Sequence, residues 1–263
     1  MTALLLPLLA LVALCAIFHA VFLLARRIDN YGIVDIAWSY AFAPLALFYA
    51  LAASTGWAPR RALIATLVTL WSLRLGTHLY RRVMGHHPVE DTRYQTLRET
   101  WSANFSSKMA WFFQSQAASV VVLGLPFLLI VRNPAQSFHP LELAASALWL
   151  IAVLGESLAD AQLAAFRRDP FRHGQVCDRG LWRFSRHPNY FFEWLIWVAY
   201  FVFALASPWG CFAIIAPGII LYLLLRVTGI PLAEAQSLRS KGDAYRRYQA
   251  TTSPFIPWFP KKS

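Results

Sequence analysis

Long apolar runs recur along the whole chain and constrain its fold more than any other feature. Each run approaches the length of about 20 residues that an α-helix needs to cross a bilayer. Backbone groups inside a bilayer must find their hydrogen-bond partners within the protein, so isolated apolar runs predict helices. Seven runs meet this description: residues 3–25, 33–53, 62–80, 109–131, 141–163, 190–206 and 209–228. We therefore predict an all-α, polytopic membrane protein with seven transmembrane helices.

The basic residues divide unevenly between the segments that join these runs. None precedes the first run, whereas Arg26 and Arg27 follow it, so we expect an uncleaved span rather than a secretory signal. Of the 24 Lys and Arg, five lie in residues 81–108, six in 164–189 and seven from Arg226 onward. If the spans alternate, the opposite side holds only Arg60, Arg61 and Arg132. The positive-inside rule then predicts the N-terminus outside and the C-terminus inside.

The composition excludes several classes of protein. A net charge of +11 without any nucleic-acid-binding motif indicates topology rather than a nucleic-acid partner. His86 and His87 with Glu90 do not predict a metal site, because adjacent side chains diverge and Pro88 interrupts a helix. Cysteines without paired spacing argue against a disulfide framework or a zinc site: Cys15, Cys177 and Cys211. Arginine far outnumbers lysine, which favours a bacterial source and therefore the bacterial inner membrane.

Residues 180–203 pass from a basic, polar segment into an apolar run. Pro188 suits the first turn of a helix, where its missing N–H group has no cost. The amides that follow point outward at the positive end of the helix dipole, next to Arg183, Arg186 and His187. This arrangement predicts an anion site at the start of the sixth span.

Acidic and amide side chains predict a second part of the same site. Asn189 and Glu193 are four residues apart and share one face of the sixth span. Glu156 and Asp160 share one face of the preceding run in the same way, and Arg167 lies near that second stripe. Carboxylates within a span are costly and are functional candidates by default. We expect these two stripes to lie together and to bind the sugar or carboxamide groups of a ligand, and we expect Arg167 to bind its phosphate. The alternative is an ion pair that only joins the helices.

The loop of residues 164–189 is rich in arginine and would form an anion funnel opposite the helix start. The alternative is a topology signal without ligand binding. Its arginines are Arg167, Arg168, Arg172, Arg179, Arg183 and Arg186.

Asp35 is a lone acid in the second run, and Arg74 in the third run is its expected partner. In a low-dielectric pocket Asp35 would donate a proton or polarise a carbonyl group. A buried ion pair that serves packing is the alternative. In the tail, Arg226 ends the last run, Glu234 and Tyr245 are further contact candidates on short polar segments, and residues 254–260 are expected at the membrane interface.

These residues resemble the steroid 5α-reductase superfamily, and more closely its uncharacterised bacterial membrane branch. The resemblance covers most of the chain. It rests on Arg186-His-Pro-Asn-Tyr190 with Glu193, on Asp160 with Arg167, on Glu234 and Tyr245, on Asp35-Ile-Ala-Trp38, and on Glu90-Asp-x-Arg-Tyr94.

The resemblance implies a seven-helix reductase that binds NADPH and transfers hydride to an activated carbon–carbon double bond of a lipophilic substrate. It implies one membrane domain over residues 1–263, with residues 1–131 on the substrate side and 141–263 on the cofactor side, facing the cytoplasm. Cofactor positions implied by the resemblance are Asp160, Arg167, Asn189, Glu193 and Arg226. The residues above add Arg172, Arg183, Arg186, His187, Tyr190, Glu234 and Tyr245.

Asp35 falls where the family has a catalytic glutamate, and Arg74 completes the predicted catalytic pair. The third run lacks the tyrosine that polarises the carbonyl group in the family; Arg74 and Leu75 occupy that region.

Two other functions stay open. Membrane isoprenylcysteine methyltransferases, which use S-adenosylmethionine, also have an Arg-His-Pro-x-Tyr start to a helix, as residues 186–190 have here. A non-catalytic membrane protein that retains the fold is the third possibility. The expected partners are a lipophilic small molecule and membrane lipid, with the oligomeric state left open.

Overall fold

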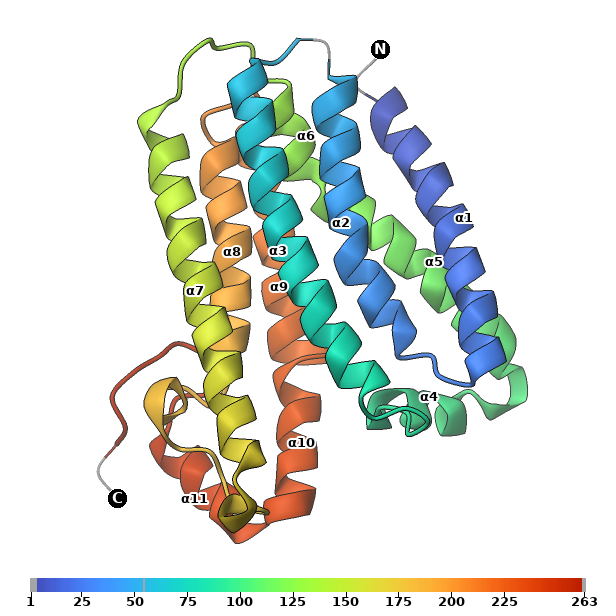
Figure 1. The fold of residues 1–263 in the computed structure, drawn as a ribbon, viewed down its shortest axis with the longest axis vertical. Helices are drawn as coiled ribbons and strands as arrows, with labels where there is room; N and C mark the ends of the chain where they lie inside the picture. Colours follow the sequence, from blue (N-terminus) through green and yellow to red (C-terminus); the bar gives the residue numbers. More distant parts are fainter. Residues whose placement is uncertain (1–3, 54, 262–263) are drawn as a thin grey trace. The chain divides into compact units, whose positions relative to one another are not determined.

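The computed structural model describes residues 4–53 and 55–261, and every regular element within these ranges is a helix (Figure 1). The prediction of an all-α protein is confirmed. The expected start of the first run at Ala3 lies outside the described residues. Six helical stretches are long and apolar enough to cross a membrane: Leu5–Ile28, Ile33–Ala52, Ala58–Met84, Ser102–Val131, Pro140–Arg168 and Gly210–Lys241.

The predicted sixth span differs from the others in length. It is helix α8, Pro188–Ala204, and it has 17 residues. At 1.5 Å per residue the helix is about 26 Å long, which is shorter than the hydrocarbon core of about 30 Å. The seventh span and the orientation of the termini therefore stay predictions from the sequence.

By its internal contacts the chain divides into two compact units. One comprises Met1–Phe138 with Ala206–Gly210, and the other comprises His139–Leu205 with Cys211–Ser263. The helices of the first unit are α1 (Leu5–Ile28), α2 (Ile33–Ala52), α3 (Ala58–Met84), α4 (Thr92–Thr100), α5 (Phe105–Leu123) and α6 (Leu125–Val131).

Within this unit α2 packs against α3, and α1 packs against both α5 and α2 (Figure 1). Gly76 permits the close approach of α3 to α2, because a Cβ atom there would lie 2.6 Å from ring atoms of Tyr40. Pro44 interrupts the hydrogen-bond ladder inside α2. Ser72 of α3 bridges two backbone groups of α2 in the turn that precedes Pro44. Its hydroxyl accepts from the Ala43 amide at 3.2 Å and donates to the Ser39 carbonyl at 2.6 Å.

Two of the arginines predicted on the outer side have structural roles. Arg60 is 1% exposed, and its guanidinium donates to the backbone carbonyls of Asn133, Ala135 and Ser137. Arg61 donates to the carbonyls of Ala50 and Ala53 at the end of α2. Carbonyls at a helix end have no partner within the helix, so a cation there is favourable.

The second unit contains α7 (Pro140–Arg168), α8 (Pro188–Ala204), α9 (Ile215–Tyr222), α10 (Ile230–Lys241) and α11 (Asp243–Thr251). A π-helical segment, Leu223–Val227, lies between α9 and α10. Short 3₁₀ turns occupy Pro170–Arg172, Gly180–Arg183 and Gly210–Ile214. The polar helix expected around Glu234 is α10.

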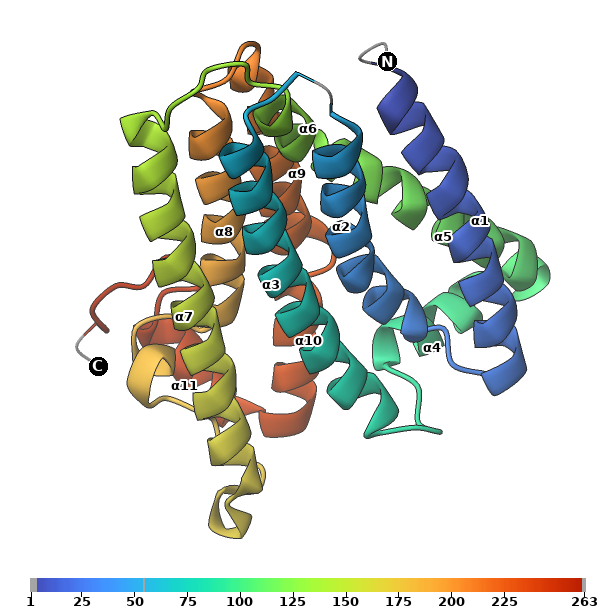
Figure 2. The ribbon, with the colours of Figure 1, turned by 45° about the horizontal axis from the view of Figure 1, so that its top comes forward.

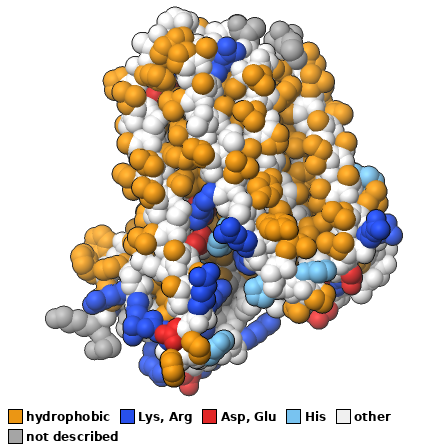
Figure 3. Space-filling model, in the orientation of Figure 1, with side chains coloured by type: hydrophobic (Ala, Val, Ile, Leu, Met, Phe, Trp, Pro, Cys, Tyr) orange, Lys and Arg blue, Asp and Glu red, His pale blue; other side chains and the backbone are white. Residues whose placement is uncertain are grey.

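The pair α7 and α8 forms the centre of this unit. Gly155 permits their close approach, since a Cβ atom there would lie 2.4 Å from the Phe192 ring. The segment after α7 folds back along it and lies beside α11 (Figure 2). Figure 3 shows hydrophobic side chains over most of α7, and basic side chains gathered where α7 ends and where α10 and α11 lie.

Candidate functional site

The predicted stripes on α7 and α8 meet at Asp160 and Asn189. The side-chain amide of Asn189 donates to the carboxylate of Asp160, with 3.3 Å between Nδ2 and Oδ1. The carbonyl oxygen of the same Asn189 side chain is buried and has no hydrogen-bond partner in the described part of the chain. Leaving a buried acceptor unpaired costs about 1–3 kcal/mol, so the arrangement is suited to a ligand that brings a donor.

Further carboxylates continue this polar line into the helix pair. Glu193, one turn beyond Asn189 on α8, accepts from the indole N–H of Trp197 at 3.0 Å. Glu156, one turn before Asp160 on α7, is 4% exposed. Tyr200 lies near both Glu193 and Glu156. The expectation that the polar stripes of the two helices lie together is confirmed for Asp160 and Asn189.

A pocket of about 420 Å³ lies where α7 ends. Gln162 anchors its wall, because the Leu181 amide donates to the Gln162 carboxamide oxygen at 2.8 Å. Its lining combines polar, acidic, basic and apolar residues, among them Gln162, Phe166, Asp169, Arg172, Cys177 and Arg179. Burial raises the pKa of the Cys177 thiol, which disfavours a reactive thiolate there.

The arginines of this loop fall into two groups. Arg172 pairs with Asp169 at 2.8 Å. Four are exposed and have no acidic partner among residues 4–53 and 55–261: Arg167, Arg168, Arg179 and Arg183. These four guanidinium groups are thus available to an anion, and Arg226, on the π-helical segment, is also exposed.

Arg186 differs from the exposed arginines, because its guanidinium donates hydrogen bonds to groups within the protein. It is 9% exposed, and its Nε donates to Glu234 at 2.7 Å. Its Nη1 donates to the carbonyls of Gln249 at 3.0 Å and Thr252 at 2.6 Å. Arg186 therefore attaches the C-terminal segment to the start of α8.

Glu234 is the centre of the same cluster rather than a group open to solvent. Besides Arg186, it accepts from Gln249 at 2.8 Å, and its carboxylate lies 3.4 Å from Nε2 of His187. The His187 ring stacks on Tyr190, with centroids 5.3 Å apart and planes within 6°. These residues fix the geometry of the turn that opens α8.

The tail contributes residues that sequence reasoning did not identify. The Tyr248 hydroxyl donates to the carbonyls of Trp182 and Ser185, and the Ser185 hydroxyl donates to the Phe255 carbonyl at 2.8 Å. Burial raises the pKa of Tyr245, a predicted site residue, to about 12, so its hydroxyl stays protonated. The spacing of two tyrosines three apart, both facing inward from α11, is the signal that identifies this face.

Asp35 has different partners from those predicted. Arg93 donates to its Oδ2 at 2.7 Å, and the Tyr94 hydroxyl donates to its Oδ1 at 2.8 Å. Arg82 lies 3.8 Å away. The predicted pairing with Arg74 is wrong. Asp35 lies in the first turn of α2, opposite the end of antiparallel α3, whereas Arg74 is ten residues before that end, about 15 Å along the helix.

Tyr94 is the functional candidate that sequence reasoning overlooked. Burial, and then the neighbouring Asp35 carboxylate, raise the pKa of Tyr94 well above its usual value, so the hydroxyl keeps its proton. Burial alone would raise the pKa of Asp91, but hydrogen bonds and charge from Arg93 outweigh burial and lower it. The motif Glu90-Asp-x-Arg-Tyr94 was visible in the sequence, yet no periodicity connects it to α2.

Glu90 holds the same loop against the unit. It is 8% exposed, accepts from the Tyr31 amide at 2.7 Å and pairs with Arg98 at 2.7 Å. Arg98 also pairs with Asp29 at 2.7 Å. Among the described residues no group of three or more His, Cys, Asp or Glu is placed to hold a metal ion.

The chain belongs to the family described as "Protein of unknown function (DUF1295)", whose profile matches residues 21–252. It is also 29% identical over 214 residues to an uncharacterized protein of Schizosaccharomyces pombe. That match covers 70% of this chain and 62% of the yeast protein. No solved structure matches the chain.

Proposed function

We propose that the protein is a membrane reductase that uses NADPH to saturate an activated carbon–carbon double bond of a lipophilic substrate. The observation that carries the proposal is the buried, unpartnered carbonyl oxygen of Asn189, held beside the Asp160 carboxylate. Nicotinamide and ribose bring the carboxamide N–H and hydroxyl donors that this pair can accept.

The residues present fit NADPH in charge as well as in hydrogen bonding. Asn189, Asp160 and Glu193 would hold its uncharged polar groups, and Arg167, Arg183 and Arg226 its phosphates. Arg186, His187, Glu234 and Tyr245 would act behind this surface by fixing the turn that opens α8. When bound, NADPH supplies a hydride.

The reaction also needs a proton, and the first unit offers one candidate pair for it, Asp35 with Tyr94. Saturating the double bond adds a hydride to one carbon and a proton to the other, and leaves NADP⁺. Tyr94 stays protonated and donates its O–H to Asp35, which also accepts from Arg93. In this proposal Tyr94 takes the role of the tyrosine that the third run lacks, and Asp35 is a positioning residue.

Cofactor binding is tested by equilibrium binding of tritiated NADPH to the protein in mild detergent. Asn189→Ala removes the buried acceptor and should weaken binding by about tenfold, the equivalent of one hydrogen bond of about 1.4 kcal/mol. Asn104→Ala, at an exposed asparagine, is the matched control and should bind as the unaltered protein does. Saturable binding that is equal in both variants would refute the site.

The proton donor is tested separately. Once a lipophilic enone substrate is found, Tyr94→Phe should lower kcat by at least about 100-fold, the usual range for general acid catalysis, with NADPH affinity unchanged. Tyr80→Phe, at a half-exposed tyrosine, is the control and should keep its kcat. A Tyr94→Phe enzyme with full kcat would exclude this role.

S-adenosylmethionine is the second candidate, because its ammonium and ribose groups could also donate to the Asn189 oxygen. It has one carboxylate and no phosphate, so it leaves the exposed arginines without a role. Thermal unfolding with each ligand separates the two, since a bound ligand raises the melting temperature by mass action. Stabilisation by S-adenosylmethionine alone would favour a methyltransferase, and by neither ligand a non-catalytic protein.

A further inference from the structure

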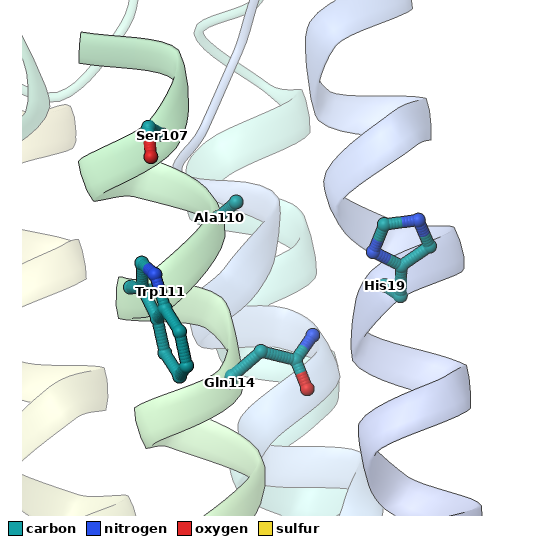
Figure 4. Close-up of a pocket in the computed structure, with 5 residues that line it drawn as sticks. All are labelled: His19, Ser107, Ala110, Trp111 and Gln114. Carbon is teal, nitrogen blue, oxygen red and sulfur yellow. The ribbon is translucent and has the colours of Figure 1, made fainter. Parts of the chain in front are cut away.

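A groove of about 170 Å³ lies between α1 and α5, on the outer side of helices long enough to cross a membrane. Its walls are His19 from α1 and Ser107, Ala110, Trp111 and Gln114 from α5. Figure 4 shows the Gln114 side chain reaching from α5 towards α1, where His19 stands. Neither helix contributes any other residue to this lining.

The groove carries polar side chains where a lipid-facing surface should be apolar. The side chains of His19, Ser107, Trp111 and Gln114 have no hydrogen-bond partner among residues 4–53 and 55–261. His19 and Trp111 are exposed at the surface. A polar group without a partner in hydrocarbon costs several kcal/mol, so His19 and Gln114, the two groups furthest from the helix ends, favour a polar occupant.

The depth of these groups identifies the kind of occupant. His19 is nine residues before the end of α1, and Gln114 is nine residues after the start of α5, about 14 Å from the same end of the helix pair. Ser107 lies near the end itself, in the first turn of α5. The polar groups therefore form a path from the membrane surface into the outer part of the hydrocarbon.

The end of the groove at the membrane surface is basic. Arg26 is seven residues beyond His19 and thus lies two turns further on the same face of α1. Its guanidinium lies 5.8 Å from the Phe22 ring centroid, and Phe22 contacts Phe113 of α5, so Arg26 lies on the side of α1 that faces α5. Asp29, the nearby acid, already pairs with Arg98 at 2.7 Å.

We propose that this groove binds one anionic glycerophospholipid from the leaflet at the basic end of α1. Its phosphate contacts Arg26 and Ser107, and its ester carbonyls accept from Gln114 and His19. The groove, of about 170 Å³, is small and suits the glycerol ester region of one lipid rather than a whole lipid molecule. Trp111 packs beside the glycerol region, as tryptophan does at membrane interfaces.

Native mass spectrometry of delipidated protein, given equal amounts of phosphatidylglycerol and phosphatidylcholine with the same acyl chains, tests the proposal. The unaltered protein should retain one phosphatidylglycerol in preference to phosphatidylcholine. Arg26→Gln should lower that retention about fivefold, the effect of one basic residue near a charged membrane surface. Arg27→Gln is the matched control, because Arg27 lies in the same turn but about 100° around the helix.

A second variant separates the groove from its rim. His19→Leu with Gln114→Leu should reduce retention of phosphatidylglycerol and leave the melting temperature unchanged or higher, since both changes favour a lipid-facing helix. Equal retention of the two lipids by the unaltered protein would overturn the proposal, as would equal losses in Arg26→Gln and Arg27→Gln. A dimer mass that disappears in the double variant would identify a second copy of the chain as the occupant instead.

Discussion

Replacing Glu234 by glutamine should release the C-terminal segment from the start of α8. The change keeps the side-chain size and removes the charge that faces Arg186 at 2.7 Å. The two side chains are 10% and 16% exposed, so the pair is much closer to a buried ion pair than to a surface one. Breaking a buried pair costs about 3–5 kcal/mol and a surface pair about 0–1 kcal/mol. Arg186 keeps two carbonyl acceptors, which lowers the expected loss to about 2 kcal/mol.

Hydrogen exchange measures this loss where it acts. The Trp258 amide donates to the Phe184 carbonyl at 2.9 Å, and the Arg186 amide donates to the Ser253 carbonyl at 2.8 Å, so both report attachment of the segment. A loss of about 2 kcal/mol in the local opening free energy should speed their exchange roughly 30-fold. The matched control is Glu99→Gln, at an exposed glutamate on α4, and it should leave both rates unchanged.

The result also separates a structural role of the pair from a direct cofactor role. A structural role predicts faster exchange in the absence of any nucleotide, and a coupling energy of about 2 kcal/mol in a double-mutant cycle of Arg186→Gln with Glu234→Gln. Exchange at Trp258 within twofold of the unaltered protein would refute the reasoning. Equal acceleration throughout α7 would also refute it, because the loss would then be global.

Three further outcomes follow from local geometry. Burial alone would raise the pKa of Asp91, but the neighbouring Arg93 lowers this pKa in the folded protein. The Asp91 carboxylate therefore contributes its full stabilisation above about pH 4, and this stabilisation is lost as the pH falls through the folded-state pKa. The melting temperatures of Asp91→Asn and of the unaltered protein should converge in acid. Ser72→Ala should cost about 1–2 kcal/mol in thermal unfolding, because it removes the hydroxyl between two backbone groups of α2, whereas exposed Ser106→Ala should cost nothing measurable. Gly155→Ala should lower the free energy of unfolding by about 1–3 kcal/mol, because its Cβ atom would lie 2.4 Å from the Phe192 ring. Gly218→Ala is the control and should be neutral or stabilising, since a Cβ atom there meets no atom within 4 Å. An equal loss in both variants would contradict this packing.

The sequence by itself determined where the long apolar helices lie, but it did not predict the short polar helices α4 and α11. Membrane-length apolar runs must satisfy their backbone hydrogen bonds internally, and this requirement is local, so hydropathy alone predicts it. The Asp160–Asn189 contact was also predictable, because α7 and α8 are consecutive helices and each carries its polar residues at a spacing of four. Neither inference needed knowledge of distant contacts.

Only the tertiary structure decided the partners of residues far apart in the chain. Asp35 meets Arg93 and Tyr94 rather than Arg74, because the antiparallel register of α2 and α3 brings the end of α3 and its following loop to the start of α2. Arg186 meets Glu234, 48 residues away, and is thereby withdrawn from solvent. Residue type and spacing specify which groups face the same side of one helix. Which group meets them across an interface depends on helix register and loop path, and these are set by the packing of all the helices together.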